Sequence, residues 1–231
     1  MDKTQPVIEL DLYIIRHGES LGNVGYGGKT DLTLKEGVDP VLTEKGLSQS
    51  AAAGEYLKDI SFDEFYASPM LRAARTATEI MKSQPEEKPL HIMPELCEVG
   101  VTPDYKGVEI DEIREFSPHA VYAEDTQTTE TRMRYDTHEE NDKVNERARF
   151  VIDYFRSRYK NGEKIVIVSH AAFITNLVFT IMGLDKQAPE FDIDYNNTGI
   201  TRVTYYKHGT YKWGDTVFRY INSTAHYSLI K

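Results

Sequence analysis

The chain has 231 residues, and its formal net charge of −10 reflects 37 acidic and 27 basic side chains. This length is enough for one α/β domain with a sizeable core, and the acidic balance disfavours nucleic acid, which selects basic surfaces. The single cysteine, Cys97, rules out an internal disulfide and fits a reducing compartment. No apolar stretch approaches the length of a membrane span, so we expect a cytoplasmic protein with no membrane partner.

Apolar runs rich in β-branched and aromatic residues predict six strands, and periodic patterns predict five helices among them. The strands are expected near 8–15, 63–67, 89–93, 164–169, 199–206 and 215–221. The helices are expected near 43–59, 70–82, 109–116, 139–160 and 171–182. This alternation predicts a three-layer α/β/α fold with helices on both faces of a mostly parallel sheet. The last two strands flank a turn, so we expect a hairpin at the sheet's edge.

We expect one domain over residues 1–231, with a lid-like insertion at about 105–140 where the periodic pattern weakens. The insertion is rich in Asp and Glu, and its basic candidates for a substrate contact are Arg114, Arg132 and Arg134. Exposed arginines are common, so solvated surface charge is the favoured interpretation of all three.

The first predicted strand ends in Arg16-His17-Gly18-Glu19. In an open α/β sheet, ligands bind just beyond the carboxyl ends of the strands. The planar fork of an arginine matches phosphate, and a histidine offers a nucleophile or a proton carrier near neutral pH. From this segment alone, a surface Arg-His pair remains the alternative.

Three later features strengthen the functional interpretation. Arg72 lies at the start of the helix after Ser68, Glu98 follows a Leu-Cys pair, and His170 ends a second buried strand. With these motifs the chain resembles the histidine phosphatase superfamily, also called phosphoglycerate mutase-like, over nearly its whole length. The resemblance rests on the signature at residues 16–20, which Asn23 follows three residues later. It also rests on the stretch 39–46 and on the segment around Arg72.

The resemblance implies that His17 is a nucleophile that passes through a phosphohistidine. Its other ring nitrogen should donate to a backbone carbonyl such as that of Gly18, which would fix the tautomer. Arg16, Arg72 and a protonated His170 would surround the phosphoryl oxygens.

A departing alkoxide needs a proton, and the resemblance makes Glu98 the general acid. Glu19 is the rival acid by position, but its place in the signature favours a structural ion pair. No cofactor and no metal are expected, because arginine supplies the positive charge and the sequence has no HxxxH or CxxC spacing.

The resemblance also suggests substrate contacts from Ser20, Asn23 and Ala171. Ala171 departs from the glycine that family members usually carry after the second histidine, although its backbone N–H remains available. The stretch Asn197-Thr198-Gly199 is assigned a support role only.

These observations predict a histidine acid phosphatase-type phosphoric monoester hydrolase that acts on small phosphorylated metabolites without a metal. A cofactor-dependent phosphoglycerate mutase is the alternative, but the interval from Glu98 to His170 is short and acidic, which favours the phosphatase branch. A non-catalytic member that binds a phosphorylated ligand is the third possibility. The sequence determines neither the physiological ester nor the oligomeric state.

Overall fold

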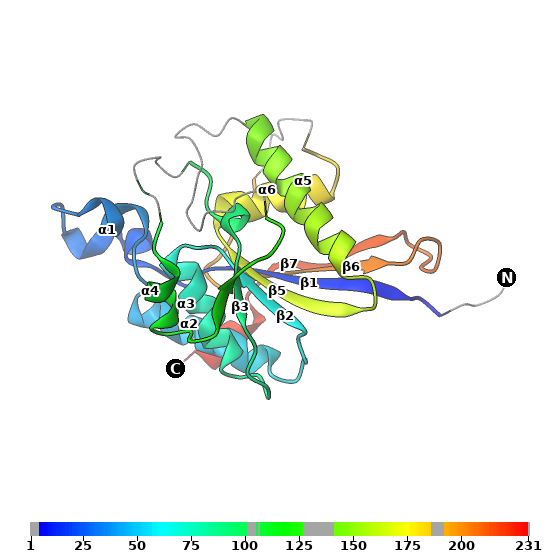
Figure 1. Cartoon of the computed structure of the whole chain (residues 1–231), viewed down its shortest axis with the longest axis horizontal. Coiled ribbons are helices and arrows are strands. Elements are labelled where there is room, and N and C mark those ends of the chain that lie inside the picture. The colour runs from blue at the N-terminus through cyan, green and yellow to red at the C-terminus, as the bar shows by residue number, and fades with distance from the viewer. Residues whose placement is uncertain (1–4, 101–104, 106, 127–140, 186–191, 231) are drawn as a thin grey trace.

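The computed structural model describes residues 5–100, 105, 107–126, 141–185 and 192–230 (Figure 1). Within them, seven strands form one sheet in the order β4-β3-β2-β5-β1-β6-β7. The strands are β1 Ile8–Arg16, β2 Glu64–Ala67, β3 Leu90–Ile92, β4 Ala120–Tyr122, β5 Glu163–Ser169, β6 Ile200–Tyr206 and β7 Thr216–Ser223. The α-helices are α1 Leu34–Val38, α2 Glu44–Leu57, α3 Leu71–Met81, α4 Ile110–Arg114, α5 Asn141–Arg158 and α6 Ala171–Ile181. The 3-10 segments are η1 Leu21–Gly28, η2 Pro94–Leu96 and η3 Ala225–Leu229.

The sheet is mixed and mostly parallel, as predicted. Strands β1 to β5 pair in parallel, and only β6 runs antiparallel to both of its neighbours. The hairpin β6–β7 occupies one edge, which confirms the expectation for the last two strands. The opposite edge is β4. It was not predicted, because its three residues lie in the stretch interpreted as a lid-like insertion.

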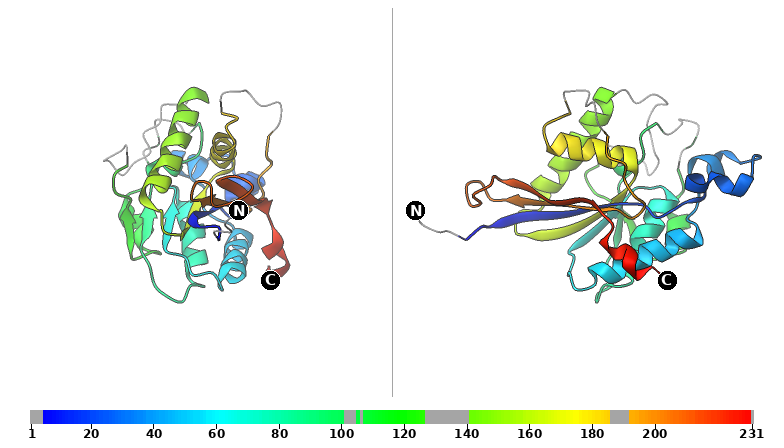
Figure 2. Two further views of the ribbon diagram at one scale, coloured as in Figure 1. Left: turned by 90° about the vertical axis from the view of Figure 1, so that its right-hand side faces the viewer. Right: turned by 180° about the vertical axis from the view of Figure 1, so that it is seen from behind.

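Helices cover both faces of the sheet, which confirms the three-layer fold (Figures 1 and 2). Side chains of a strand point alternately to the two faces. In β1, Leu12 and Ile14 pack in the core beneath α5 and α6, whereas Tyr13 and Ile15 pack in the core beneath α2 and α3. The strand is therefore buried on both sides, as its nearly unbroken apolar run predicts.

The stretch expected to be a lid is described only in part. Its first portion forms α4 and the edge strand β4, which pairs with β3. Residues 127–140, and with them Arg132 and Arg134, lie outside the described residues. No helix in the described part of the chain is both long enough and apolar enough to cross a membrane.

Two glycines bring the end of β1 against the start of α2. A Cβ on Gly18 would lie 2.5 Å from the carbonyl oxygen of Gly46, and a Cβ on Gly46 would lie 2.0 Å from that of Glu19. The Thr43 side chain caps α2 by accepting from Gly46 N at 3.0 Å, as its position before the helix predicts. The loop after β1 thus packs closely against the first turn of α2.

Candidate active site

The carboxyl ends of β1 and β5 bring the two predicted histidines together. These strands pair in parallel with Arg16 opposite Ser169, so the next residue of each is a histidine. The ring centroids of His17 and His170 lie 5.1 Å apart, and both side chains are buried. Residues separated by more than 150 positions in the sequence therefore share one site.

The His17 ring is held in one tautomer. Its Nδ1 lies 2.7 Å from the carbonyl oxygen of Gly18, which can only accept, so Nδ1 carries the proton. Burial, followed by the positive charges of Arg72 and Arg16, holds the pKa of His17 well below its usual value. The ring is therefore neutral, and Nε2 keeps its lone pair.

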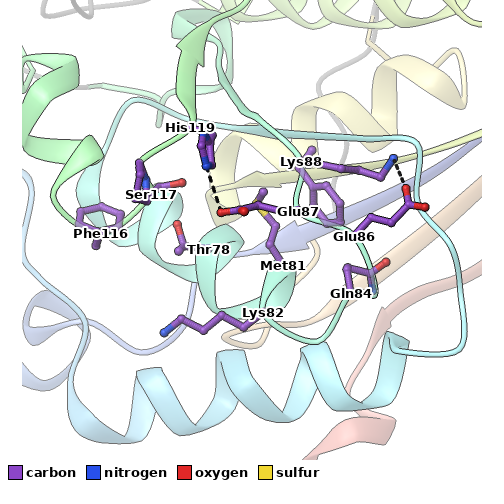
Figure 3. Close-up of a pocket in the computed structure, with 12 residues that line it drawn as sticks. Thr78, Met81, Lys82, Gln84, Glu86, Glu87, Lys88, Phe116, Ser117 and His119 are labelled. Atoms are coloured by element: carbon purple, nitrogen blue, oxygen red, sulfur yellow. Dashed lines mark ion pairs between the residues drawn. The ribbon is translucent and has the colours of Figure 1, made fainter.

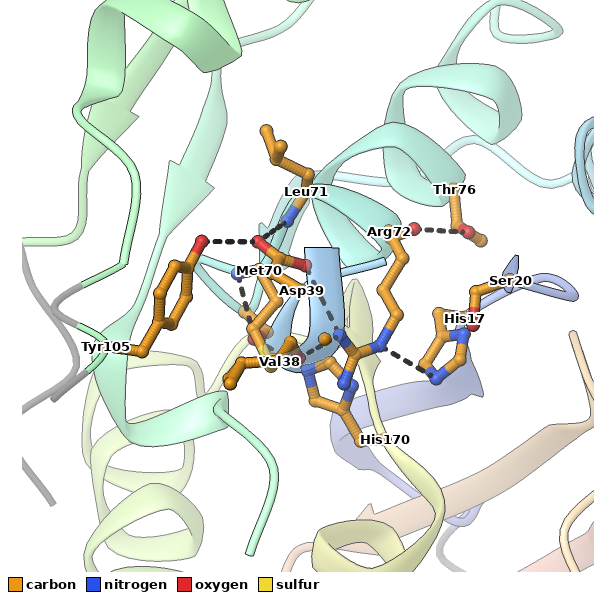
Figure 4. Close-up of polar contacts among 12 residues, drawn as sticks. His17, Ser20, Val38, Asp39, Met70, Leu71, Arg72, Thr76, Tyr105 and His170 are labelled. Atoms are coloured by element: carbon orange, nitrogen blue, oxygen red, sulfur yellow. Dashed lines mark hydrogen bonds and ion pairs between the residues drawn. The ribbon is translucent and has the colours of Figure 1, made fainter. Parts of the chain in front are cut away.

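Arg72 faces that lone pair from the first turn of α3. Its Nε donates to His17 Nε2 at 3.2 Å, and its Nη1 donates to the carboxylate of Asp39 at 3.2 Å (Figure 4). The Asp39 side chain is fully buried and also accepts from Leu71 N at 2.8 Å and from the Tyr105 hydroxyl at 3.2 Å. Burial raises the pKa of Asp39, and the Arg72 guanidinium opposes that rise.

Sequence reasoning did not assign a role to Asp39, because a carboxylate is seldom fully buried and its partner lies 33 positions away. The only signal was its place in the stretch that resembles the family. The structure shows that this carboxylate anchors the guanidinium of Arg72.

His170 and Arg16 each present a buried nitrogen without a hydrogen bond in the described structure, Nδ1 and Nε respectively. The other His170 nitrogen lies 2.7 Å from the Ser68 hydroxyl, and Arg16 Nη1 donates to the carbonyl of Tyr195. Buried polar atoms normally have partners, so these two nitrogens fit a ligand that accepts hydrogen bonds.

Burial disfavours positive charge at this site. Burial lowers the pKa of Arg16, and burial together with Arg72 lowers that of His170 well below its usual value. With this pKa the His170 ring is neutral near pH 7, and the protonated ring expected around the phosphoryl oxygens stays a prediction for bound phosphate. A bound dianion would reverse this preference, because an opposite charge stabilises the charged form.

Glu98 lies in the loop after η2, and its side chain contacts the first turn of α6. Its Oε1 accepts from Val99 N at 2.9 Å and from Phe173 N at 3.1 Å, so the N-terminal turn of the helix holds the carboxylate. Arg147 of α5 is buried and donates to the carbonyl oxygen of Cys97 at 2.8 Å. This positioning role of Arg147 was not predicted, because a helix pattern does not show which arginine turns inward.

The remaining signature residues form a network beside the histidines. Asn23 Oδ1 accepts from Ser20 N at 3.0 Å, from the Ser20 hydroxyl at 3.2 Å and from Asn197 Nδ2 at 3.1 Å. Glu19 turns away and pairs with Lys45 at 2.6 Å. Its side chain thus makes the structural ion pair expected of it.

Two further candidates are placed by the structure. Ala171 is the first residue of α6, directly after His170. Arg114 binds the carbonyl of Ala120 at 3.1 Å and the carboxylate of Asp111 at 3.0 Å, so it is engaged at the β4 edge of the sheet. No group of three or more metal-ligating side chains occurs among the described residues.

A separate hollow of about 330 Å³ lies between the end of α3 and the turn that precedes β4 (Figure 3). Its walls include Met81 and Phe116, and its charged groups are paired, Glu87 with His119 at 3.1 Å and Glu86 with Lys88 at 3.8 Å. It shares no residue with the histidine site.

The model of the histidine phosphatase superfamily (branch 1) matches residues 12–215. The chain belongs to the histidine phosphatase superfamily. The match confirms the predicted family, and the solved structures below confirm the predicted fold.

Curated relatives of this superfamily member include both phosphatases and mutases. The chain is 35% identical over 82 residues to a fructose-2,6-bisphosphatase TIGAR of Xenopus laevis, covering 36% of the chain and 28% of that protein. It therefore spans only about a quarter of the length of that relative. It is 26% identical over 202 residues, 85% of each chain, to a probable phosphoglycerate mutase GpmB of Erwinia tasmaniensis.

Solved structures share the fold at low identity. A phosphoserine phosphatase mutant of Entamoeba histolytica aligns with a TM-score of 0.60 at 23% identity, covering 94% of this chain and 98% of that one. A phosphoglycerate mutase of Bacillus anthracis aligns with a TM-score of 0.61 at 19% identity, covering 98% and 97%. These likenesses show the histidine phosphatase fold, and they do not separate hydrolysis from mutase chemistry.

Proposed function

We propose that this superfamily member is a metal-independent phosphomonoesterase that acts on small phosphorylated metabolites through a phosphohistidine on His17. The observation that carries the proposal is the locked tautomer: Nδ1–H is bound to Gly18 O, so the lone pair of Nε2 is presented beside Arg72 Nε. A neutral imidazole with its lone pair directed at a cluster of cations is suited to attack an anionic phosphoryl group.

In the first step, Nε2 of His17 bonds to phosphorus while the bond from phosphorus to the ester oxygen breaks. Arg16, Arg72 and His170 stabilise the negative charge on the phosphoryl oxygens, and the dianion draws a proton onto His170. Glu98 gives its proton to the departing alkoxide, which leaves as an alcohol.

In the second step, water attacks the phosphohistidine. Glu98, now a carboxylate, takes a proton from that water, the bond from phosphorus to Nε2 breaks, and inorganic phosphate leaves. The free amide nitrogen of Asn23 and the backbone N–H of Ala171 are the proposed substrate contacts, since the Asn23 oxygen is already occupied by Ser20 and Asn197.

A phosphoglycerate mutase would use the same histidine, and the Erwinia relative gives this alternative weight. A mutase must also hold a second phosphate. Arg114, the one insertion arginine that the structure describes, is engaged at the β4 edge with Ala120 and Asp111. This placement supports hydrolysis over interconversion.

The test combines a rate comparison with a chemical trap. Phosphate release from a panel of phosphorylated metabolites is measured in EDTA, alongside interconversion of 2- and 3-phosphoglycerate with 2,3-bisphosphoglycerate supplied. We expect hydrolysis to be the faster reaction and a quenched sample to carry an acid-labile phosphoryl group on His17. Interconversion that outruns the best hydrolysis, or a metal requirement, would overturn the proposal.

A further inference from the structure

The loop before β6, residues 195–199, holds the main chain of the proposed nucleophile. Thr198 N and Asn197 Nδ2 both donate to the carbonyl oxygen of His17, each at 3.2 Å. The same Asn197 amide donates to Asn23 Oδ1 at 3.1 Å. A shift of this loop would therefore move the His17 backbone and a proposed substrate contact together.

This loop contains a backbone conformation that does not form readily by itself. Thr198 has a φ of 54°, in the left-handed region that β-branched residues rarely adopt, and its side chain is fully buried. Such residues persist only when their surroundings hold them in place. The groups that contact Thr198 and Asn197 thus determine the position of the His17 backbone.

One of these groups is His226 in η3, which is fully buried. Its Nε2 lies 2.8 Å from Thr198 Oγ1, and that hydroxyl donates its own proton to Asn197 O at 2.7 Å. The hydroxyl must therefore accept from a protonated Nε2 of His226. Burial lowers the pKa of His226 to about 4, so the ring is neutral at neutral pH and donates through this one nitrogen.

The next residue, Tyr227, makes a second contact. Its hydroxyl also donates to Asn197 O. The segment η3 also packs against α2 (Figure 2). The ring of Tyr56 in α2 lies 6.2 Å from that of His226. The segment η3 is thus fixed between α2 and the loop 195–199.

We propose that η3 is part of the catalytic architecture, with His226 and Tyr227 as positioning residues that hold the loop 195–199 against the His17 carbonyl. This inference rests on the proposed phosphatase function. Neither residue is among the proposed substrate contacts. They act through Thr198 and Asn197, and through these on the orientation of His17.

The main test compares two replacements of His226. Gln keeps a donor near the Nε2 position, whereas Phe keeps an aromatic ring and removes the donor. We expect His226→Phe to lower kcat by about ten- to a hundredfold, because small misplacements of a reacting group cost that much, and His226→Gln to retain most of the wild-type rate. KM should change less than kcat in the Phe variant.

Tyr227→Phe is the milder companion, because it removes one hydroxyl and leaves the ring. Its control is Tyr159→Phe, which removes a hydroxyl bonded to Tyr66 at 2.7 Å and contacts no residue of the site. If the two variants lose similar thermal stability, only Tyr227→Phe should lose kcat. This pair still tests the proposal if His226→Phe does not fold.

A second readout does not depend on turnover. In ¹⁵N-labelled protein, the Nδ1–H of His17 bound to Gly18 O gives a distinct imidazole signal, which His226→Phe should shift or broaden and Tyr159→Phe should leave in place. A folded His226→Phe variant with wild-type kcat and an unchanged His17 signal would overturn the inference. A wild-type protein with no phosphatase activity would overturn the proposed function, while the imidazole signal would still test the role of η3.

Discussion

His17 and His170 follow neighbouring strands and share one buried site, yet they are held differently. The Nδ1 of His17 binds a backbone carbonyl, a partner that can only accept. The Nε2 of His170 binds the Ser68 hydroxyl, which can either donate or accept. The first arrangement fixes one neutral tautomer, whereas the second leaves the protonation state open to change when an anion binds.

This difference separates the site into two halves. The β1 half presents the lone pair of His17 Nε2. Arg72 of α3 donates to that nitrogen, and Asp39 anchors Arg72. In the proposed reaction, the β5 half, continued by α6, transfers protons through His170 and Glu98. If this division is correct, substitutions in the two halves should change the kinetics of hydrolysis in different ways.

The largest effect should come from the β1 half. His17→Ala removes the side chain proposed to form the covalent intermediate, so kcat should fall by about four to six powers of ten. The measurement is steady-state hydrolysis of an aryl phosphate, with the phosphoenzyme trap in parallel. A loss of less than about tenfold, or an acid-labile phosphoryl group that persists in the variant, would contradict the division.

The next effect tests the proton-handling half. Glu98→Gln should slow alkyl phosphates by about a hundred- to ten-thousandfold, because the departing alkoxide loses its proton donor. Aryl phosphates with good leaving groups should lose far less. Equal losses on both substrates would make Glu98 a structural residue and would direct attention to Glu19.

A smaller effect should follow from Asp39→Asn, which removes the negative charge that anchors Arg72. We expect KM for phosphate esters to rise by about tenfold or more, because the guanidinium is no longer fixed beside His17. Asp63→Asn is the matched control, since its carboxylate also accepts from a backbone N–H, that of Lys164 at 2.8 Å. If both variants keep the wild-type KM, the carboxylate of Asp39 does not position Arg72.

The smallest effect concerns the partner of His170. Ser68→Ala removes one hydrogen bond worth about 1 kcal/mol, so kcat should fall by about fivefold. Burial and Arg72 already lower the pKa of His170. The Ser68 hydroxyl can accept a charge-assisted hydrogen bond from the protonated ring, which is stronger than its bond to the neutral ring, so its loss lowers that pKa further. The His170 ring then loses its proton at lower pH, so the alkaline limb of the plot of kcat against pH should move to lower pH.

Ser157→Ala provides the reference for that profile, because its hydroxyl bonds the carbonyl of Tyr154 at 3.1 Å within α5. An alkaline limb that stays in place in Ser68→Ala would assign it to a group other than His170.

Much of this picture follows from the sequence because the decisive residues stand at the ends of long apolar strands. The runs of β1 and β5 are buried on both faces, so their apolar pattern is nearly unbroken and their ends are easily located. Their pairing then places His17 beside His170. By contrast, β4 has three residues and depends on β3 for its existence.

The contacts that the sequence did not reveal are long-range ones between polar groups. Asp39, Arg147 and His226 are all buried, and each acts on a segment at least 28 positions away. No periodicity shows that a carboxylate or an imidazole turns inward.

The contact between Gly18 and Gly46 limits how the enzyme can be altered. With main-chain atoms this close, even an added methyl group at either position would push the signature loop away from α2. Directed evolution of substrate preference should therefore find almost no tolerated change at these two positions. Useful variation should accumulate instead on η1, where Leu21 and Val24 are exposed beside the same loop.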